Sequence, residues 1–126
     1  PAGRGFIVRA VPILVDLVDR GVAIALSTDY TPGTSPIASM PLAISLACVL
    51  LRISVAEAIA AATINAAFAV GLADQVGSLE AGKQADLQVL EARDYREVPY
   101  RFGENLVRRV IVGGRTVLER PAVGPL

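Results

Sequence analysis

Apolar residues recur at helical spacing near the start of the chain, and an unbroken apolar run follows them. Valines lie three or four residues apart at Val8, Val11, Val15 and Val18. This stripe predicts an amphipathic helix that ends at Gly21, because glycine readily adopts the left-handed conformation of a helix end. Residues 22–26 are all apolar and precede polar residues 27–29, which predicts a strand buried on both faces. A helix followed by such a strand is typical of a parallel α/β sheet or barrel.

Two further helices are expected after a loop. Residues 30–36 contain two prolines and a glycine, which indicates a loop, and either Ser35 or Ser39 could cap the helix that follows. Residues 54–57 read SVAE and match a capping box, in which serine and glutamate bond to each other's backbone donors. They predict the start of an alanine-rich helix that closes near Gly71.

The C-terminal part of the chain has the alternating pattern of β-structure. Residues 85–89 alternate between apolar and polar and predict a strand. Residues 107–112 and 115–119 predict a hairpin joined by the glycines at 113–114, since two-residue hairpin turns favour positive φ. Residues 94–105 hold proline, glycine and polar residues and predict a long loop.

Composition excludes several classes of function. Hydrophobic residues make up 53% of the 126 residues, so the chain can bury a core. Lys plus Arg equals Asp plus Glu at 12 each, and the basic residues are scattered, so no nucleic-acid partner is expected. The uncharged run at residues 37–51 is shorter than a bilayer requires and contains Pro41, so no membrane span is expected. Cys48 is the single cysteine and no histidine could activate it, which favours a core residue and a reducing, cytoplasmic setting.

One motif carries the main functional signal. Residues 25–36 read ALSTDYTPGTSP, and this stretch resembles the segment of imidazolonepropionases that ends the last barrel strand. The resemblance continues through residues 39–43, 62–67, 76–87 and 105–114. It implies an α/β fold: the C-terminal part of a metal-dependent-hydrolase (β/α)8 TIM barrel, in the amidohydrolase superfamily, plus strands of a small β-sandwich. On this basis we expect residues 1–73 to end the barrel and residues 74–126 to supply C-terminal strands of the sandwich.

The same resemblance assigns roles to residues of the loop. It implies that Asp29 is both a metal ligand and a catalytic residue, and barrel enzymes carry catalytic groups just beyond their strands. The motif alone also fits a turn residue. The substrate-binding positions it implies are Thr31, Gly33 and Thr34, for which an ordinary helix-entry loop is the alternative. Thr31 departs from the asparagine expected there and replaces an amide with a smaller hydroxyl. Outside this loop, Thr63 and Asn65 are interpreted as packing and hydrogen-bonding residues.

The activity implied by the resemblance is hydrolysis of the cyclic amide of 4-imidazolone-5-propanoate to N-formimidoyl-L-glutamate, a step of histidine degradation. It implies one Zn or Fe ion, a small-molecule substrate, a cytoplasmic location and a possible homodimer. The alternatives are another cyclic amidase or deaminase of the superfamily, or a non-catalytic apolar piece. The start at Pro1 indicates a fragment of a longer protein. Because the sequence contains no histidine, we expect the fragment alone to hold no stoichiometric ion and to be inactive.

Overall fold

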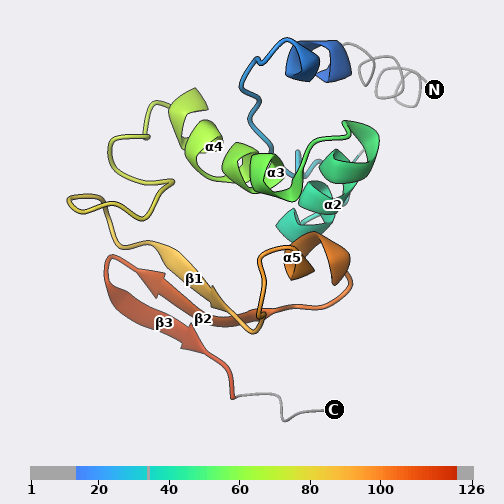
Figure 1. Ribbon diagram of the computed structural model, residues 1–126. Helices are drawn as coiled ribbons and strands as arrows, with labels where there is room; N and C mark the ends of the chain where they lie inside the picture. Colours follow the sequence, from blue (N-terminus) through green and yellow to red (C-terminus); the bar gives the residue numbers. More distant parts are fainter. Residues whose placement is uncertain (1–13, 34, 122–126) are drawn as a thin grey trace.

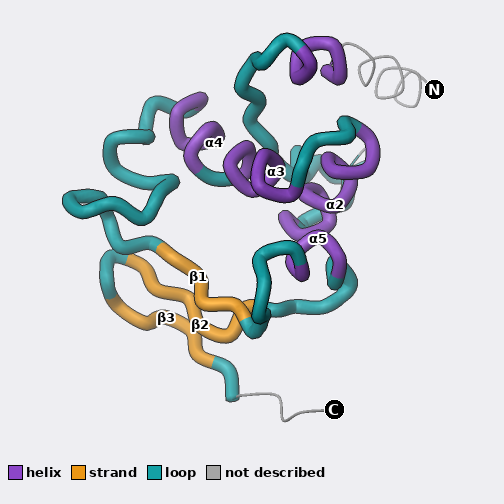
Figure 2. The backbone as a smooth tube through the Cα atoms, viewed as in Figure 1, coloured by secondary structure: helices purple, strands orange, loops and turns teal. Residues whose placement is uncertain are grey.

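Helices and a small sheet form two parts of the molecule. The computed structural model describes residues 14–33 and 35–121. The elements in chain order are α2 (Met40–Leu50), α3 (Val55–Ala62), α4 (Ile64–Ala69), β1 (Leu87–Leu90), α5 (Glu97–Tyr100), β2 (Val107–Val112) and β3 (Arg115–Glu119). Figure 1 shows α2, α3 and α4 together on one side and the three strands on the other, with α5 beside α2. Figure 2 shows that long loops connect the two parts.

The first predicted helix ends where the sequence indicates. Residues 14–19 are helical, and the positions of the predicted helix before residue 14 lie outside the described residues. Gly21 has φ 76°. Its N–H donates to the carbonyl of Val18 at 2.8 Å, and the N–H of Val22 donates to the carbonyl of Leu17 at 3.0 Å. These two bonds form a Schellman motif, so the predicted glycine cap is confirmed.

The strand predicted for residues 22–26 is wrong: this segment has no regular secondary structure. A strand requires a neighbouring strand, and the sheet of the described residues contains only β1, β2 and β3. The helices α3 and α4 supply hydrogen-bonding partners along one edge of this segment instead. The N–H of Leu26 donates to the carbonyl of Ala61 at 2.9 Å, and Nδ2 of Asn65 donates to the carbonyl of Ile24 at 2.9 Å.

Side-chain caps begin the next two helices. Oγ of Ser39 accepts the N–H of Leu42 at 3.4 Å, so Ser39 rather than Ser35 caps α2. Oγ of Ser54 accepts the N–H of Glu57 at 3.2 Å, and a carboxylate oxygen of Glu57 accepts the N–H of Ser54 at 2.7 Å. The predicted capping box is therefore confirmed.

The alanine-rich helix predicted to run from residue 54 to Gly71 is broken at Thr63. Thr63 has φ −125° and ψ −93°, and it separates α3 from α4. Its Oγ1 donates to the carbonyl of Ile59 at 2.7 Å, a back-bond that bends helices. Gly77 packs against this break: a Cβ there would lie 2.7 Å from Cβ of Ala67 and 3.1 Å from the carbonyl oxygen of Thr63. Tertiary contacts thus override a local helix preference.

The three strands form an antiparallel sheet in the order β1-β2-β3. The predicted hairpin between β2 and β3 is confirmed, and its turn residues Gly113 and Gly114 have φ 55° and 76°. The N–H of Gly113 donates to a carboxylate oxygen of Asp86 at 2.7 Å, which ties the turn to the chain just before β1. All residues of β3 are exposed.

The loop predicted for residues 94–105 is wrong in one part, because it contains α5. Carboxylates supply the backbone partners that a short helix lacks. Glu97 accepts the N–H groups of Arg93 and Asp94 at 2.9 and 3.2 Å. Asp94 accepts the N–H of Arg96 at 2.8 Å. These local bonds hold the helical turn.

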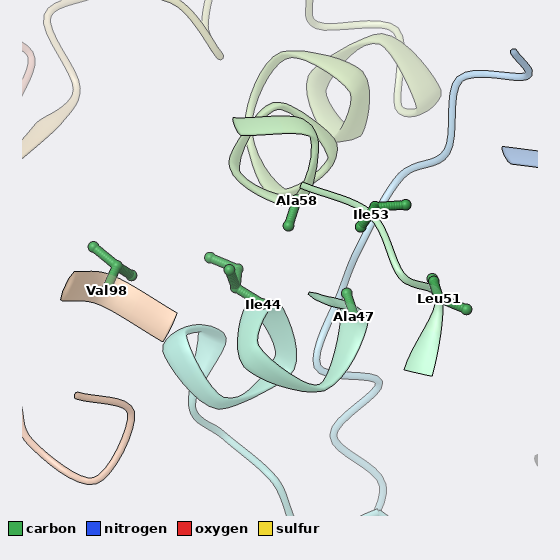
Figure 3. Close-up of a cluster of buried hydrophobic side chains, with 6 residues drawn as sticks. All are labelled: Ile44, Ala47, Leu51, Ile53, Ala58 and Val98. Atoms are coloured by element: carbon green, nitrogen blue, oxygen red, sulfur yellow. The ribbon is translucent and has the colours of Figure 1, made fainter. Parts of the chain in front are cut away.

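The core lies between α2, α3 and α5. Figure 3 shows its buried side chains, which are Ile44, Ala47, Leu51, Ile53, Ala58 and Val98. Ala58 and Ala61 are fully buried, and their small side chains allow neighbouring segments to approach closely. Ile24 and Leu26 pack against this cluster as partly buried residues. Val98 belongs to the predicted C-terminal part, so that part contributes to the core, while the boundary at residue 73 stays a prediction.

None of the described helices has the length and apolar character that a crossing of the bilayer requires.

We expect Gly77→Ala to lower the free energy of unfolding by about 2 to 4 kcal/mol, because φ +95° is strained for alanine and the new Cβ meets close neighbours. Gly82→Ala is the matched control, since Gly82 has φ +94° with nothing within 4 Å of its Cβ position. That variant should lose only about 1 to 2 kcal/mol of unfolding free energy, which is the cost of a left-handed backbone for alanine. Urea denaturation followed by circular dichroism measures both losses. Equal losses would contradict the close packing at Gly77.

The stability contributed by the turn around α5 should decrease with acid. The Arg96 guanidinium and N–H lower the pKa of Asp94 to about 2, from 3.8. The N–H of Arg93, followed by the Arg101 guanidinium, lowers the pKa of Glu97 below 4.5. Carboxylates with a lowered folded-state pKa stabilise fully above their unfolded pKa, and this stability is lost as pH falls through the folded pKa. The loss should therefore run from about pH 5 down to about 2.

Urea midpoints measured between these pH values test this expectation. Asp94→Asn removes one of the two titrating groups, so its midpoint should depend less on pH than that of the unchanged chain. Identical pH dependence in the two proteins would show that Asp94 is not stabilised in the folded state.

Candidate functional site

Two of the predicted site residues, Thr31 and Gly33, lie in a narrow turn of the loop after residue 26. Thr31 and Ser35 pair through two backbone hydrogen bonds of 2.9 Å each. Gly33 lies inside this turn with φ 94°, a conformation that favours glycine. Thr34 lies outside the described residues. The turn therefore brings Thr31 and Gly33 close to each other at an exposed part of the surface.

Asp29 has an unusual backbone conformation, with φ 47°. Aspartate tolerates this left-handed region better than most residues, because its short side chain can bond locally. The N–H of Asp29 donates to Oγ of Ser27 at 3.2 Å, and Oγ1 of Thr31 donates to the carbonyl of Asp29 at 3.2 Å. Oγ of Ser35 donates to the carbonyl of Thr28 at 3.3 Å. The main chain around Asp29 is thus fixed by three hydroxyl groups.

The Asp29 side chain is exposed, as are Thr31 and Gly33. Within the described residues, no protein group hydrogen-bonds to the carboxylate of Asp29. The loop therefore joins Asp29 and Thr31 through the main chain and leaves the carboxylate available to a ligand.

The residues of this loop can supply one ligand of a metal site, but they cannot supply all the ligands that such a site needs. A carboxylate is an ordinary oxygen ligand for zinc or iron. A catalytic zinc takes three protein ligands. The sequence contains no histidine, and no group of three or more His, Cys, Asp or Glu residues converges within the described part of the chain.

A hollow of about 870 Å³ lies elsewhere, between the start of α2, α3 and the connection from α5 to β2. Its walls include Ser39, Met40, Ile59, Leu90, Phe102 and Leu106. Neither Asp29 nor Thr31 lines it. The hollow is therefore separate from the predicted site.

Two other residues behave as the sequence suggested. Cys48 is partly buried against the core, and burial raises the pKa of its thiol. Asn65 forms a long-range hydrogen bond to the segment that leads to Asp29. Its position in an alanine-rich helix predicted a hydrogen-bonding role, but no pattern identified Ile24 as the partner.

Comparisons with solved structures define the class of the fold. An amidohydrolase from Thermotoga maritima aligns with a TM-score of 0.69 and 28% identity, over 87% of this chain and 26% of that protein. The guanine deaminase of E. coli aligns with a TM-score of 0.69 and 25% identity, over 86% of this chain and 30% of that protein. The chain thus has the fold of one part of a TIM-barrel hydrolase.

The family follows from the sequence comparison. Residues 6–117 match the model of the amidohydrolase family, so the chain belongs to that family. It is 50% identical over 107 residues to an imidazolonepropionase of Geobacillus thermodenitrificans, which covers 85% of this chain and 25% of that protein. It is 43% identical over 111 residues to an imidazolonepropionase of Solibacter usitatus, covering 88% and 27%. The chain spans about a quarter of the length of the curated relatives it matches.

Proposed function

We propose that the full-length protein containing this chain hydrolyses the cyclic amide of 4-imidazolone-5-propanoate to N-formimidoyl-L-glutamate in histidine degradation. The observation that carries this proposal is the 50% identity to an imidazolonepropionase across 85% of the chain. The exposed carboxylate of Asp29, held in a fixed loop, supports it as a site for this chemistry. The rest of the protein would supply the other metal ligands, because this sequence has no histidine.

In the proposed reaction, water adds to the ring carbonyl and the ring C–N bond breaks. Asp29 would accept a proton from the attacking water and pass it to the leaving ring nitrogen. Asp29 would also hold the Zn or Fe ion, which when bound lowers the pKa of water to about 7. Thr31 and Thr34 would bind substrate through their hydroxyl groups. Gly33, without a Cβ, would let substrate approach the backbone.

We also propose the architecture around this site. Residues 1–73 would end a (β/α)8 barrel, and residues 74–126 would supply strands of a small β-sandwich. The exposure of every residue in β3 supports a covering layer in the full-length protein, since an isolated sheet leaves apolar side chains in water. The enzyme would act on a small molecule in the cytoplasm, as a homodimer.

A second candidate is another cyclic amidase or a deaminase of the same family. Thr31 favours it, because a hydroxyl replaces the asparagine that the resemblance leads us to expect. The structural likeness to a guanine deaminase is compatible with it. Both candidates place Asp29 at the metal.

We expect the full-length protein to turn over 4-imidazolone-5-propanoate, and we expect Asp29→Asn to lower kcat by about 10²- to 10⁴-fold. Asparagine tolerates the left-handed backbone of residue 29 but cannot accept the proton. Asp74→Asn, at another exposed aspartate, is the matched control and should keep full activity. Steady-state assays with metal analysis measure both. An Asp29→Asn enzyme with unchanged kcat would remove Asp29 from the mechanism.

Thr31→Asn separates the two candidates. If the substrate is 4-imidazolone-5-propanoate, restoring the amide should raise kcat/KM by about tenfold, the effect of one added hydrogen bond. If the natural substrate is another ring, the unchanged enzyme should prefer guanine or a cyclic amide, and Thr31→Asn should lower that activity. Turnover of another cyclic amide with none of imidazolonepropanoate would exclude the first candidate.

A further inference from the structure

The junction between α3 and α4 presents one acceptor and one donor to the segment before Asp29. The carbonyl oxygen of Ala61 accepts the N–H of Leu26, and Nδ2 of Asn65 donates to the carbonyl of Ile24, both at 2.9 Å. In an extended chain the carbonyl of one residue and the N–H of the second residue after it point to the same side. The junction therefore bonds this segment in the way that a neighbouring strand would.

The break at Thr63 makes this arrangement possible. In a continuous helix the carbonyl of Ala61 would accept the N–H of Asn65, four residues later. Because Thr63 leaves helical geometry, that carbonyl accepts from Leu26 instead. Gly77 packs against the backbone of Thr63 and Ile64, which holds the break in place.

The two hydrogen bonds that hold Ile24 and Leu26 lie close to Asp29 along the chain. Only residues 27 and 28 separate Leu26 from Asp29, and both are tied by hydroxyl groups. Oγ of Ser27 accepts the N–H of Asp29, and the carbonyl of Thr28 accepts Oγ of Ser35. A shift at Ile24 would therefore move the main chain of Asp29.

We propose that Asn65 is a positioning residue for Asp29. Its amide holds the carbonyl of Ile24 and so sets the path by which the chain enters the left-handed turn at Asp29. Asn65 acts through the main chain and does not touch substrate. This inference rests on the proposed role of Asp29, since a displaced carboxylate would cost activity only if that carboxylate takes part in the reaction.

The test uses Asn65→Ala and Asn65→Asp in the full-length protein. Aspartate has almost the volume of asparagine, but its carboxylate cannot donate to a carbonyl. Both variants should lower kcat by about 10- to 100-fold, because small displacements of a catalytic group have effects of this size. The substrate KM should change less than kcat, because Asn65 does not contact substrate itself and reaches Thr31 only through the main chain of the same loop. Asn105→Ala is the matched control, since within the described part of the chain the Asn105 side chain hydrogen-bonds only locally, to the N–H of Val107.

Two readouts besides activity separate positioning from simple stability. The N–H of Leu26 should exchange slowly with deuterium in the unchanged protein and at least tenfold faster in Asn65→Asp. The bound metal should dissociate faster from both Asn65 variants than from Asn105→Ala. A lowered unfolding midpoint with unchanged kcat per metal-loaded enzyme would overturn the inference. Rapid exchange of Leu26 in the unchanged protein would also overturn it, even if neither variant folds.

Comparison with Asp29→Asn distinguishes the two possible failures. If Asp29→Asn keeps full kcat, the proposed role of Asp29 fails, and the positioning role of Asn65 fails with it. If Asp29→Asn loses kcat while both Asn65 variants retain it, only the inference about Asn65 is overturned.

Discussion

The interruption of the helix at Thr63 is the constraint on which the arrangement around Asp29 depends. It frees the carbonyl of Ala61 for Leu26 and places Asn65 where its amide reaches Ile24. Tight packing of the 76–78 connection against the same junction requires glycine at position 77. Three segments distant in sequence thus meet at one break in a helix: the approach to Asp29, the alanine-rich helices and the start of the C-terminal part. Alanine suits this junction because its small side chain lets two main chains approach closely enough to form hydrogen bonds.

Local features were predictable from sequence because their causes lie within a few residues. The glycine cap at Gly21, the serine cap at Ser39 and the capping box at Ser54 each depend on bonds between residues at most five positions apart. The hairpin turn at 113–114 likewise follows from the backbone freedom of two glycines. In these elements, the residues that form the recognisable pattern are also the residues whose hydrogen bonds or backbone freedom produce the structure.

Features that depend on distant partners were not predictable. The apolar run at residues 22–26 reads as a buried strand, but a strand forms only beside another strand, and the described residues offer helices instead. Thr63 fits a helical pattern, and nothing nearby in the sequence predicts the non-helical φ and ψ that interrupt the helix there. The turn α5 is an exception, because Asp94 and Glu97 accept hydrogen bonds from backbone N–H groups only two and four residues away, yet a polar stretch of this kind also fits a loop. At the candidate site, the sequence located the loop of Asp29 but gave no sign of its left-handed backbone or of its tie to Asn65.

A working site needs both fixed positions for its groups and charged groups around them, and this chain supplies mainly the fixed positions. Hydroxyl groups of Ser27, Thr31 and Ser35 fix the main chain of the loop, and the helix junction fixes the approach to it. The carboxylate of Asp29, in contrast, is exposed and lacks a hydrogen-bonding partner within the described residues. A single exposed carboxylate is one ligand, so the other groups of a working site must be brought to it. In the enzyme we propose, a metal ion and imidazoles from the rest of the protein would be these groups, because a chain without histidine can aim its carboxylate but cannot complete the site.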